Sequence, residues 1–129
     1  MTGRDEARIV RPHERVLPEH QTPGMEREEA FHREGVWAGI VTIQPGELTG
    51  WHHHGEYDTY VFVLDGVGRL EYGPGGQEAQ EAHPGDFMLI PRGTVHREGS
   101  AAGSRGARAV LFRVGQGQVT FNLDGPSPP

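Results

Sequence analysis

Three consecutive histidines have the spacing of metal ligands. Side chains alternate between the two faces of a β-strand, so His52 and His54 point to one face and His53 to the other. Two imidazoles on one face can each place a nitrogen about 2.0–2.1 Å from a shared ion. His96, in the predicted strand 94–98 just after a Pro-x-Gly turn, is the candidate third ligand. The alternative is a solvated run of histidines beside a lone surface histidine.

The rest of the composition excludes several other kinds of chemistry. The chain has no cysteine, and all 12 of its basic residues are arginine. It therefore has no disulfide, no thiolate nucleophile and no lysine to form a Schiff base. Its three serines do not lie in a nucleophile elbow, and no glycine-rich run has the pattern of a phosphate-binding loop. Eight histidines and 18 carboxylates remain, and they favour metal chemistry.

Charge and hydropathy limit the partners and the location. The net charge of −6 is spread along the chain, and no basic stripe is present that would follow a nucleic-acid backbone. No apolar run approaches the roughly 20 residues of a membrane span, and the N-terminus lacks a secretory apolar region. We therefore expect a cytoplasmic protein that binds neither nucleic acid nor membrane.

Short apolar segments separated by turn residues predict an all-β fold. With 20 glycines and 10 prolines, turns are frequent, and no segment after residue 36 shows a helical period. Asp65-Gly66 is a typical hairpin dipeptide. This many strands in a chain of 129 residues indicate one sandwich or closed barrel. The predicted strands are residues 36–44, 60–64, 67–72, 77–83, 87–90, 94–98, 107–114 and 118–123.

The first 35 residues differ from the rest of the chain. They are rich in charge and poor in apolar residues, which predicts an N-terminal arm over residues 1–35. Residues 25–34 could form a short helix, with Glu29 and Arg33 as an i, i+4 pair. The barrel then occupies residues 36–123, and residues 124–129 form a flexible tail.

Two motifs make the chain similar to a known family. GELTGWHHH at residues 46–54, together with Gly66, and GDFMLIPRGTVH at residues 85–96 resemble the two conserved motifs of the cupin superfamily. The resemblance covers roughly residues 36–114 and is to the small single-domain cupins with a type-2 conserved barrel. It implies a double-stranded β-helix, or jelly-roll barrel, that holds one divalent transition metal. The ligands would be the residues matching His52, His54 and His96.

The motifs also depart from the family pattern. Thr59 occupies the position of the family's glutamate ligand, and Ser100 replaces the asparagine that usually ends the second motif. We therefore predict a three-histidine site with a vacant ligand position at Thr59. Glu56 and Asp58 are the nearby carboxylates that could serve as a fourth ligand. Glu98 lies two residues after His96 and so shares its face of the strand, which makes Glu98 a candidate hydrogen-bond partner of a metal ligand or a candidate acid or base.

The resemblance suggests a function but does not select one. A neutral three-histidine shell leaves positions open for water, dioxygen or a chelating substrate, and it does not discriminate among Fe, Zn, Ni, Co and Cu. Cupins of this kind include dioxygenases, so we expect a mononuclear, dioxygenase-like enzyme acting on a small organic molecule. The alternatives are a non-catalytic barrel that binds or senses a small ligand, and a metal-assisted isomerase or cyclase. Because both faces of segment 60–64 are apolar, we also expect a homodimer.

Overall fold

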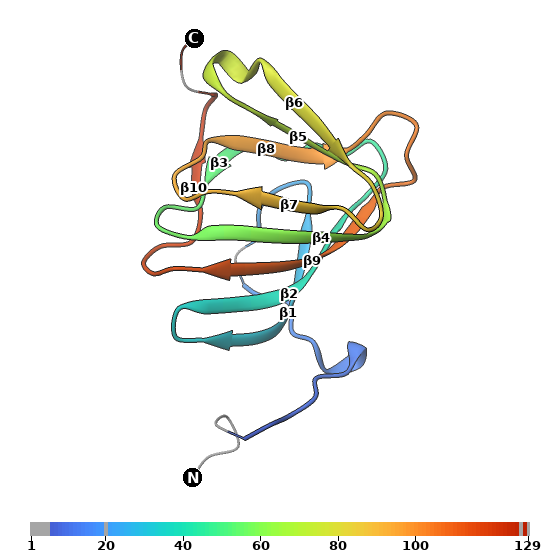
Figure 1. Cartoon of the computed structure of the whole chain (residues 1–129), viewed down its shortest axis with the longest axis vertical. Helices are drawn as coiled ribbons and strands as arrows, with labels where there is room; N and C mark the ends of the chain where they lie inside the picture. The colour runs from blue at the N-terminus through green and yellow to red at the C-terminus, as the bar shows by residue number, and fades with distance from the viewer. Residues whose placement is uncertain (1–5, 20, 127, 129) are drawn as a thin grey trace.

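Two five-stranded antiparallel sheets pack against each other in the computed structural model, which describes residues 6–19, 21–126 and 128. The first sheet has the order β1-β2-β9-β4-β7 and the second has the order β10-β3-β8-β5-β6 (Figure 1). The strands are β1 (Glu26–Arg33), β2 (Val36–Ile43), β3 (Trp51–His53), β4 (Asp58–Gly66), β5 (Gly68–Tyr72), β6 (Glu78–Ala82), β7 (Phe87–Ile90), β8 (His96–Ser100), β9 (Ala107–Val114) and β10 (Phe121–Leu123), with short 3-10 turns η2 (Pro12–Glu14) and η3 (Pro74–Gly76).

The core lies on the inner face of the first sheet, where alternate residues of neighbouring strands meet. Val61 of β4 is paired in register with Leu111 of β9, and Val41 of β2 is paired with Ala109. All four side chains are buried in the main hydrophobic cluster. Their β-branched and aliphatic side chains alternate with outward residues, which is the period-2 pattern that makes these segments strands.

The predicted helix at residues 25–34 is wrong, because this segment forms β1. Strand β1 pairs antiparallel with β2 along its length, and its Arg27 is buried, as is Met25 directly before the strand. A single i, i+4 ion pair adds only about 0.2–0.5 kcal/mol to a helix. The backbone ladder to β2 outweighs that local preference. The strand lies within residues 1–35, the segment that the sequence assigned to an arm, and the sheet therefore begins at Glu26.

Asp65-Gly66 does not form a hairpin. Strands β4 and β5 belong to different sheets, and Gly66 turns the chain from one sheet to the other with a φ of 73°. A Cβ at this position would collide with the carbonyl group of Gly106. Glycine is therefore required by a corner of the barrel and not by a two-residue hairpin turn. Residues 1–5 of the predicted arm, and residues 127 and 129 of the predicted tail, lie outside the described residues.

Candidate metal centre

The three predicted ligands meet on the inner face of the second sheet. His52 lies in β3 and is paired directly with His96, the first residue of β8, while His54 follows the end of β3. His52 and His96 are 0% exposed and His54 is 3% exposed. The centroid of the His52 imidazole lies 4.9 Å from that of His54 and 4.3 Å from that of His96. His53 points to the other face, where its ring stacks on Phe121 at 4.7 Å.

Backbone carbonyl groups orient all three rings. The Nδ1 atoms of His52, His54 and His96 lie 2.9, 2.8 and 2.8 Å from the carbonyl oxygens of Gly50, Val119 and Thr94. A carbonyl oxygen only accepts, so each Nδ1 carries a proton, and in the neutral ring Nε2 then presents a lone pair. The Nε2 atoms of His52 and His96 are buried without a hydrogen-bond partner. Buried nitrogens with free lone pairs fit a metal ion.

Glu98 completes the cluster from the same strand as His96. Its Oε1 lies 3.5 Å from Nε2 of His52 and 3.6 Å from Nε2 of His96. Ligand atoms of these three residues and His54 all lie within 4.8 Å of one another. Four ligands placed tetrahedrally about 2.1 Å from one ion would be about 3.4 Å apart. The donor set and its spacing therefore suit a single divalent ion.

Electrostatics favour an ionised carboxylate beside neutral His54. Burial opposes ionisation of Glu98, but the imidazoles of His52 and His96 hold the pKa of its carboxyl group well below the usual value. Burial, reinforced by the positive charge of Arg113, lowers the pKa of His54 to about 2. Burial also disfavours the charged form of His96, but Glu98 outweighs it and raises the pKa of His96. His54 is thus held in the neutral form that binds metal.

These directions predict how the metal-free protein responds to acid. Below pH 6.5 the unfolded chain protonates His54 while the folded chain does not, so stability falls with pH. The raised pKa of His96 contributes to the free energy of unfolding in full below pH 6.5, so this part does not change further in acid. The part contributed by the lowered pKa of Glu98 is lost only below about pH 4.5. We expect the free energy of unfolding to fall by about 2 kcal/mol between pH 6.5 and 4.5, measured with urea in the presence of a chelator. The His54→Gln variant should lose most of this dependence, and an unchanged slope would assign it to other groups.

The two loop carboxylates do not join the cluster. Asp58 accepts hydrogen bonds from the backbone N–H and the guanidinium group of Arg92, at 2.9 and 3.3 Å, and these bonds lower its pKa. Glu56 is exposed in the loop before β4. Thr59 is 1% exposed, and its hydroxyl oxygen is buried without a hydrogen-bond partner. Among the residues that the structure describes, the carboxylate that clusters with the histidines is therefore that of Glu98.

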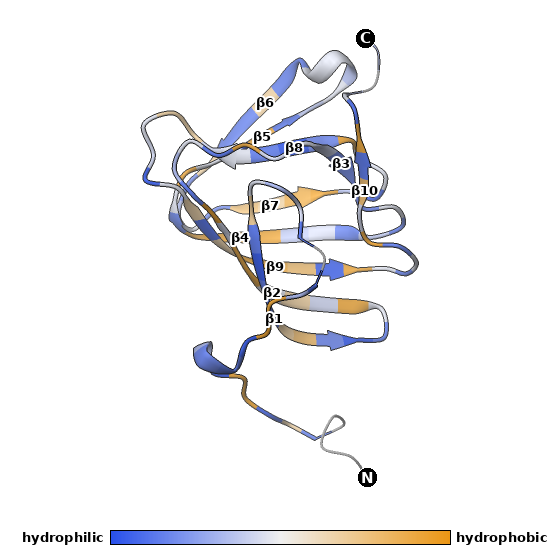
Figure 2. Cartoon of the chain, turned by 180° about the vertical axis from the view of Figure 1, so that it is seen from behind, coloured by the Kyte–Doolittle hydropathy of each residue, from blue (hydrophilic) through white to orange (hydrophobic). Residues whose placement is uncertain are grey.

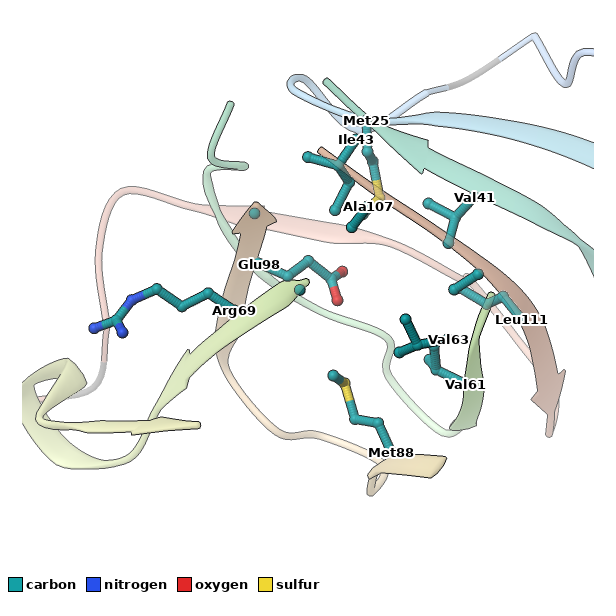
Figure 3. A pocket seen from close by; sticks show the side chains of 13 residues that line it. Met25, Val41, Ile43, Val61, Val63, Arg69, Met88, Glu98, Ala107 and Leu111 are labelled. Carbon is teal, nitrogen blue, oxygen red and sulfur yellow. The ribbon is translucent and has the colours of Figure 1, made fainter. Parts of the chain in front are cut away.

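An apolar cavity adjoins the cluster on the side of Glu98. Its volume is about 40 Å³, and its walls come mainly from aliphatic side chains such as Val41, Val63 and Met88. Figure 3 shows the Glu98 carboxylate pointing into this space. Arg69 points away from the cavity and pairs with Glu71 at 2.8 Å. The cavity has room for only a few water-sized molecules.

Two buried arginines were not predicted from the sequence as candidate site residues. Arg27 of β1 and Arg113 of β9 are each 3% exposed and face into the barrel. The signal was present in the alternation of β9, where Ala109, Leu111 and Arg113 share one face. The sequence predicts a helix for the segment that contains Arg27, and a helical period does not indicate that Arg27 points into a barrel.

The barrel is that of a jelly-roll protein, its histidine and glutamate cluster could hold a metal ion, and comparison identifies the family. The family model described as "Cupin domain" matches residues 39–113, more than half of the chain. The chain belongs to the cupin family, and the predicted resemblance and fold are confirmed. A comparison with curated proteins gave no match.

Several solved structures share this fold. The polyketide cyclase RemF from Streptomyces resistomycificus has a TM-score of 0.73 and 19% identity, over 91% of this chain and 85% of that chain. An uncharacterised protein with a double-stranded β-helix domain from Klebsiella pneumoniae has a TM-score of 0.73 and 18% identity, over 96% and 98% of the two chains. KdgF from a Halomonas species has a TM-score of 0.65 and 24% identity, over 85% and 96%. At these identities the likeness concerns the fold.

Within the part of the chain that the structure describes, no helix is long and apolar enough to cross a membrane.

Proposed function

We propose that this cupin is a mononuclear metal-dependent enzyme that acts on a small organic substrate. His52, His54 and His96 would hold the ion through their Nε2 atoms. The observation that carries the proposal is the pair of buried Nε2 atoms without partners, pointing at a largely buried carboxylate. A structural histidine in a core would instead satisfy both ring nitrogens.

The ion is a divalent transition metal, with Fe, Zn, Ni, Co and Cu all compatible with nitrogen and carboxylate donors. When bound, it would act as a Lewis acid that polarises a substrate oxygen. The backbone carbonyl groups of Gly50, Val119 and Thr94 would hold the three rings in place.

The reaction class that we favour is proton transfer within the substrate, as in an isomerase or cyclase. Glu98 has a carboxylate that is 12% exposed, faces an apolar cavity and stays ionised. It could take a proton from one substrate atom and return it to another, and such a step needs neither oxidant nor reductant. One structural relative is a polyketide cyclase, but the proposal rests on Glu98 and not on that name.

A dioxygenase-like reaction is the second candidate. Our sequence-based preference for it depended on a neutral three-histidine shell. The nearby negative charge of Glu98 removes that premise, although the apolar cavity of about 40 Å³ beside it could admit dioxygen. A non-catalytic binding or sensing barrel is the remaining alternative, and it would show ligand binding without turnover.

Metal analysis of protein purified without an affinity tag tests the first part of the proposal. We expect about one transition metal ion per chain, lost on dialysis against a chelator and regained on addition of the same metal. A panel of small organic acids and carbonyl compounds, incubated in D₂O with and without oxygen, then tests the reaction class. Deuterium incorporation without oxygen supports proton transfer, and oxygen-dependent consumption supports the dioxygenase. A protein that retains no transition metal contradicts the proposal.

We also propose that two copies pair through the outer face of the first sheet. Phe87 of β7 is 81% exposed, and Leu89 on the same strand, Tyr60 on β4 and Phe112 on β9 are also exposed. Hydrophobic residues follow the adjacent strands β7, β4 and β9 (Figure 2). A continuous apolar face of this kind is typical of an interface, and a second copy supplies a matching apolar surface.

Light scattering on the purified protein tests the dimer. We expect twice the mass of one chain, and we expect Phe87→Glu to halve that mass because it buries a charge in the interface. Ile9→Glu is the matched control, since Ile9 is 72% exposed in the segment that precedes η2 and β1. A wild-type protein with the mass of one chain contradicts the pairing.

A further inference from the structure

A second cleft enters the barrel from the side of β1, β2 and β9. It has a volume of about 1070 Å³, and its lining includes Arg27, Arg113 and Trp37. The lining combines residues of β1, β2 and β9 with residues 18, 19, 21 and 22 and residues 118–120 and 122, and the two arginines belong to it. It is the larger of the two spaces beside the metal centre, and the apolar cavity of about 40 Å³ is too small for an organic substrate.

Both arginines present an unsatisfied edge. The Nε and Nη2 atoms of Arg27 and of Arg113 are buried without a hydrogen-bond partner. These two atoms form the side of a guanidinium group that binds a carboxylate with two parallel hydrogen bonds. Two buried positive charges without hydrogen-bonded anions are unfavourable in a folded protein. What this pair lacks is an oxyanion.

Neighbouring groups position the arginines but do not neutralise them. The guanidinium group of Arg113 lies 5.4 Å from the centre of the Trp37 ring, which limits its orientation. Trp37 in turn donates a hydrogen bond of 2.8 Å from Nε1 to the carboxylate of Glu29, so this carboxylate is bound to Trp37. Burial and the charge of Arg27 lower the pKa of Arg113 to about 9, and Glu98 and Tyr57 oppose this shift. Arg113 is therefore still charged at neutral pH.

The cleft adjoins the proposed metal centre. Val119 lines the cleft, and its carbonyl oxygen accepts the hydrogen bond from Nδ1 of His54. The charge of Arg113 acts on His54, and the charge of Glu98 acts on both arginines. A substrate anchored in the cleft would thus lie beside the segment that orients the His54 ring.

We infer that Arg27 and Arg113 bind a carboxylate group of a small organic acid, which is the substrate of the metal centre. This assignment of substrate class rests on the proposed function. The guanidinium edges recognise the acid and the metal centre acts on the other end of the molecule. The arginines are binding residues, and Glu98 remains the group that moves a proton.

Titration calorimetry on the full-length protein tests this site, with succinate as the probe. Succinamide is the neutral counterpart, and inorganic phosphate tests the other common oxyanion. We expect succinate to bind and succinamide not to bind. Arg27→Met and Arg113→Met should each raise the Kd for succinate by roughly 10- to 100-fold, which is the effect of losing hydrogen bonds to a charged group. Arg105→Met, at an exposed loop arginine, should leave the Kd unchanged.

A stability measurement separates binding from a structural role. Because the variants remove an unpaired buried charge, their resistance to urea should equal or exceed that of the wild type. A large loss of stability with unchanged succinate binding would show that the arginines are structural and would overturn the inference. Phosphate binding tighter than succinate through the same arginines would overturn the assignment to a carboxylate.

Repeating the titrations with and without added Zn²⁺ separates this inference from the proposed function. Arginine-dependent succinate binding in a protein that does not bind Zn²⁺ would support the anion site and contradict the metal centre. Zn²⁺ binding with no arginine-dependent succinate binding would support the metal centre and contradict the anion site.

Discussion

Replacing His52, His54 or His96 with alanine is expected to lower the affinity for the metal by more than 100-fold. Loss of a residue that only orients a ligand reduces affinity by about 10- to 100-fold, so loss of a ligand itself should exceed that range. The three rings are buried and oriented by backbone carbonyl groups, so no neighbouring imidazole can take their place. Elemental analysis and competition with a chelating dye measure the effect.

His53→Ala is the matched control, because it removes an imidazole from the same strand. The ring of His53 stacks on Phe121 outside the barrel, and its Nδ1 accepts a hydrogen bond from the backbone of Gly55. Metal content should therefore be unchanged in this variant. If His53→Ala removed the metal and His52→Ala spared it, the strand register would be shifted by one residue and every inward assignment in β3 would fail.

The period-2 alternation of strands explains why much of this site could be predicted from sequence. Alternation alone separates His52 and His54 from His53, and it places Glu98 on the face of His96. Segments 87–90 and 107–114 are strands with the predicted bounds, because turn residues with positive φ, such as Gly85 and Gly106, delimit them. Local pattern and tertiary structure agree at these positions.

The remaining features depend on contacts between distant segments. Strand β1 looks like a charged helix until β2 is available to pair with it. Gly66 looks like a hairpin turn until the two sheets are seen to separate there. The proximity of Glu98 to Nε2 of His52 requires β3 to pair with β8, 44 residues along the chain from His52 to His96. Periodicity gives the face of a residue but not its partner across the barrel.

Glu98→Gln is expected to lower turnover by about 100-fold or more while the histidines retain the metal. The amide has nearly the same shape but cannot accept the proton at neutral pH. The assay uses the substrate identified by the D₂O screen, and metal content is measured on the same samples. If saturating metal restored full turnover, Glu98 would be a fourth ligand and not the proton acceptor.

Adding Thr59→Glu to the Glu98→Gln variant distinguishes the charge of the carboxylate from its position. By resemblance to the cupin motif, residue 59 is where a glutamate ligand would stand, and here its buried hydroxyl has no partner. Thr59→Glu alone should tighten metal binding, because it adds an anionic ligand. In the double variant, metal affinity should equal or exceed that of the wild type while turnover stays low, because the new carboxylate is on β4 and not beside the apolar cavity. Recovery of turnover in the double variant would show that Glu98 only balances the charge of the ion, and the proton-transfer mechanism would then lose its base.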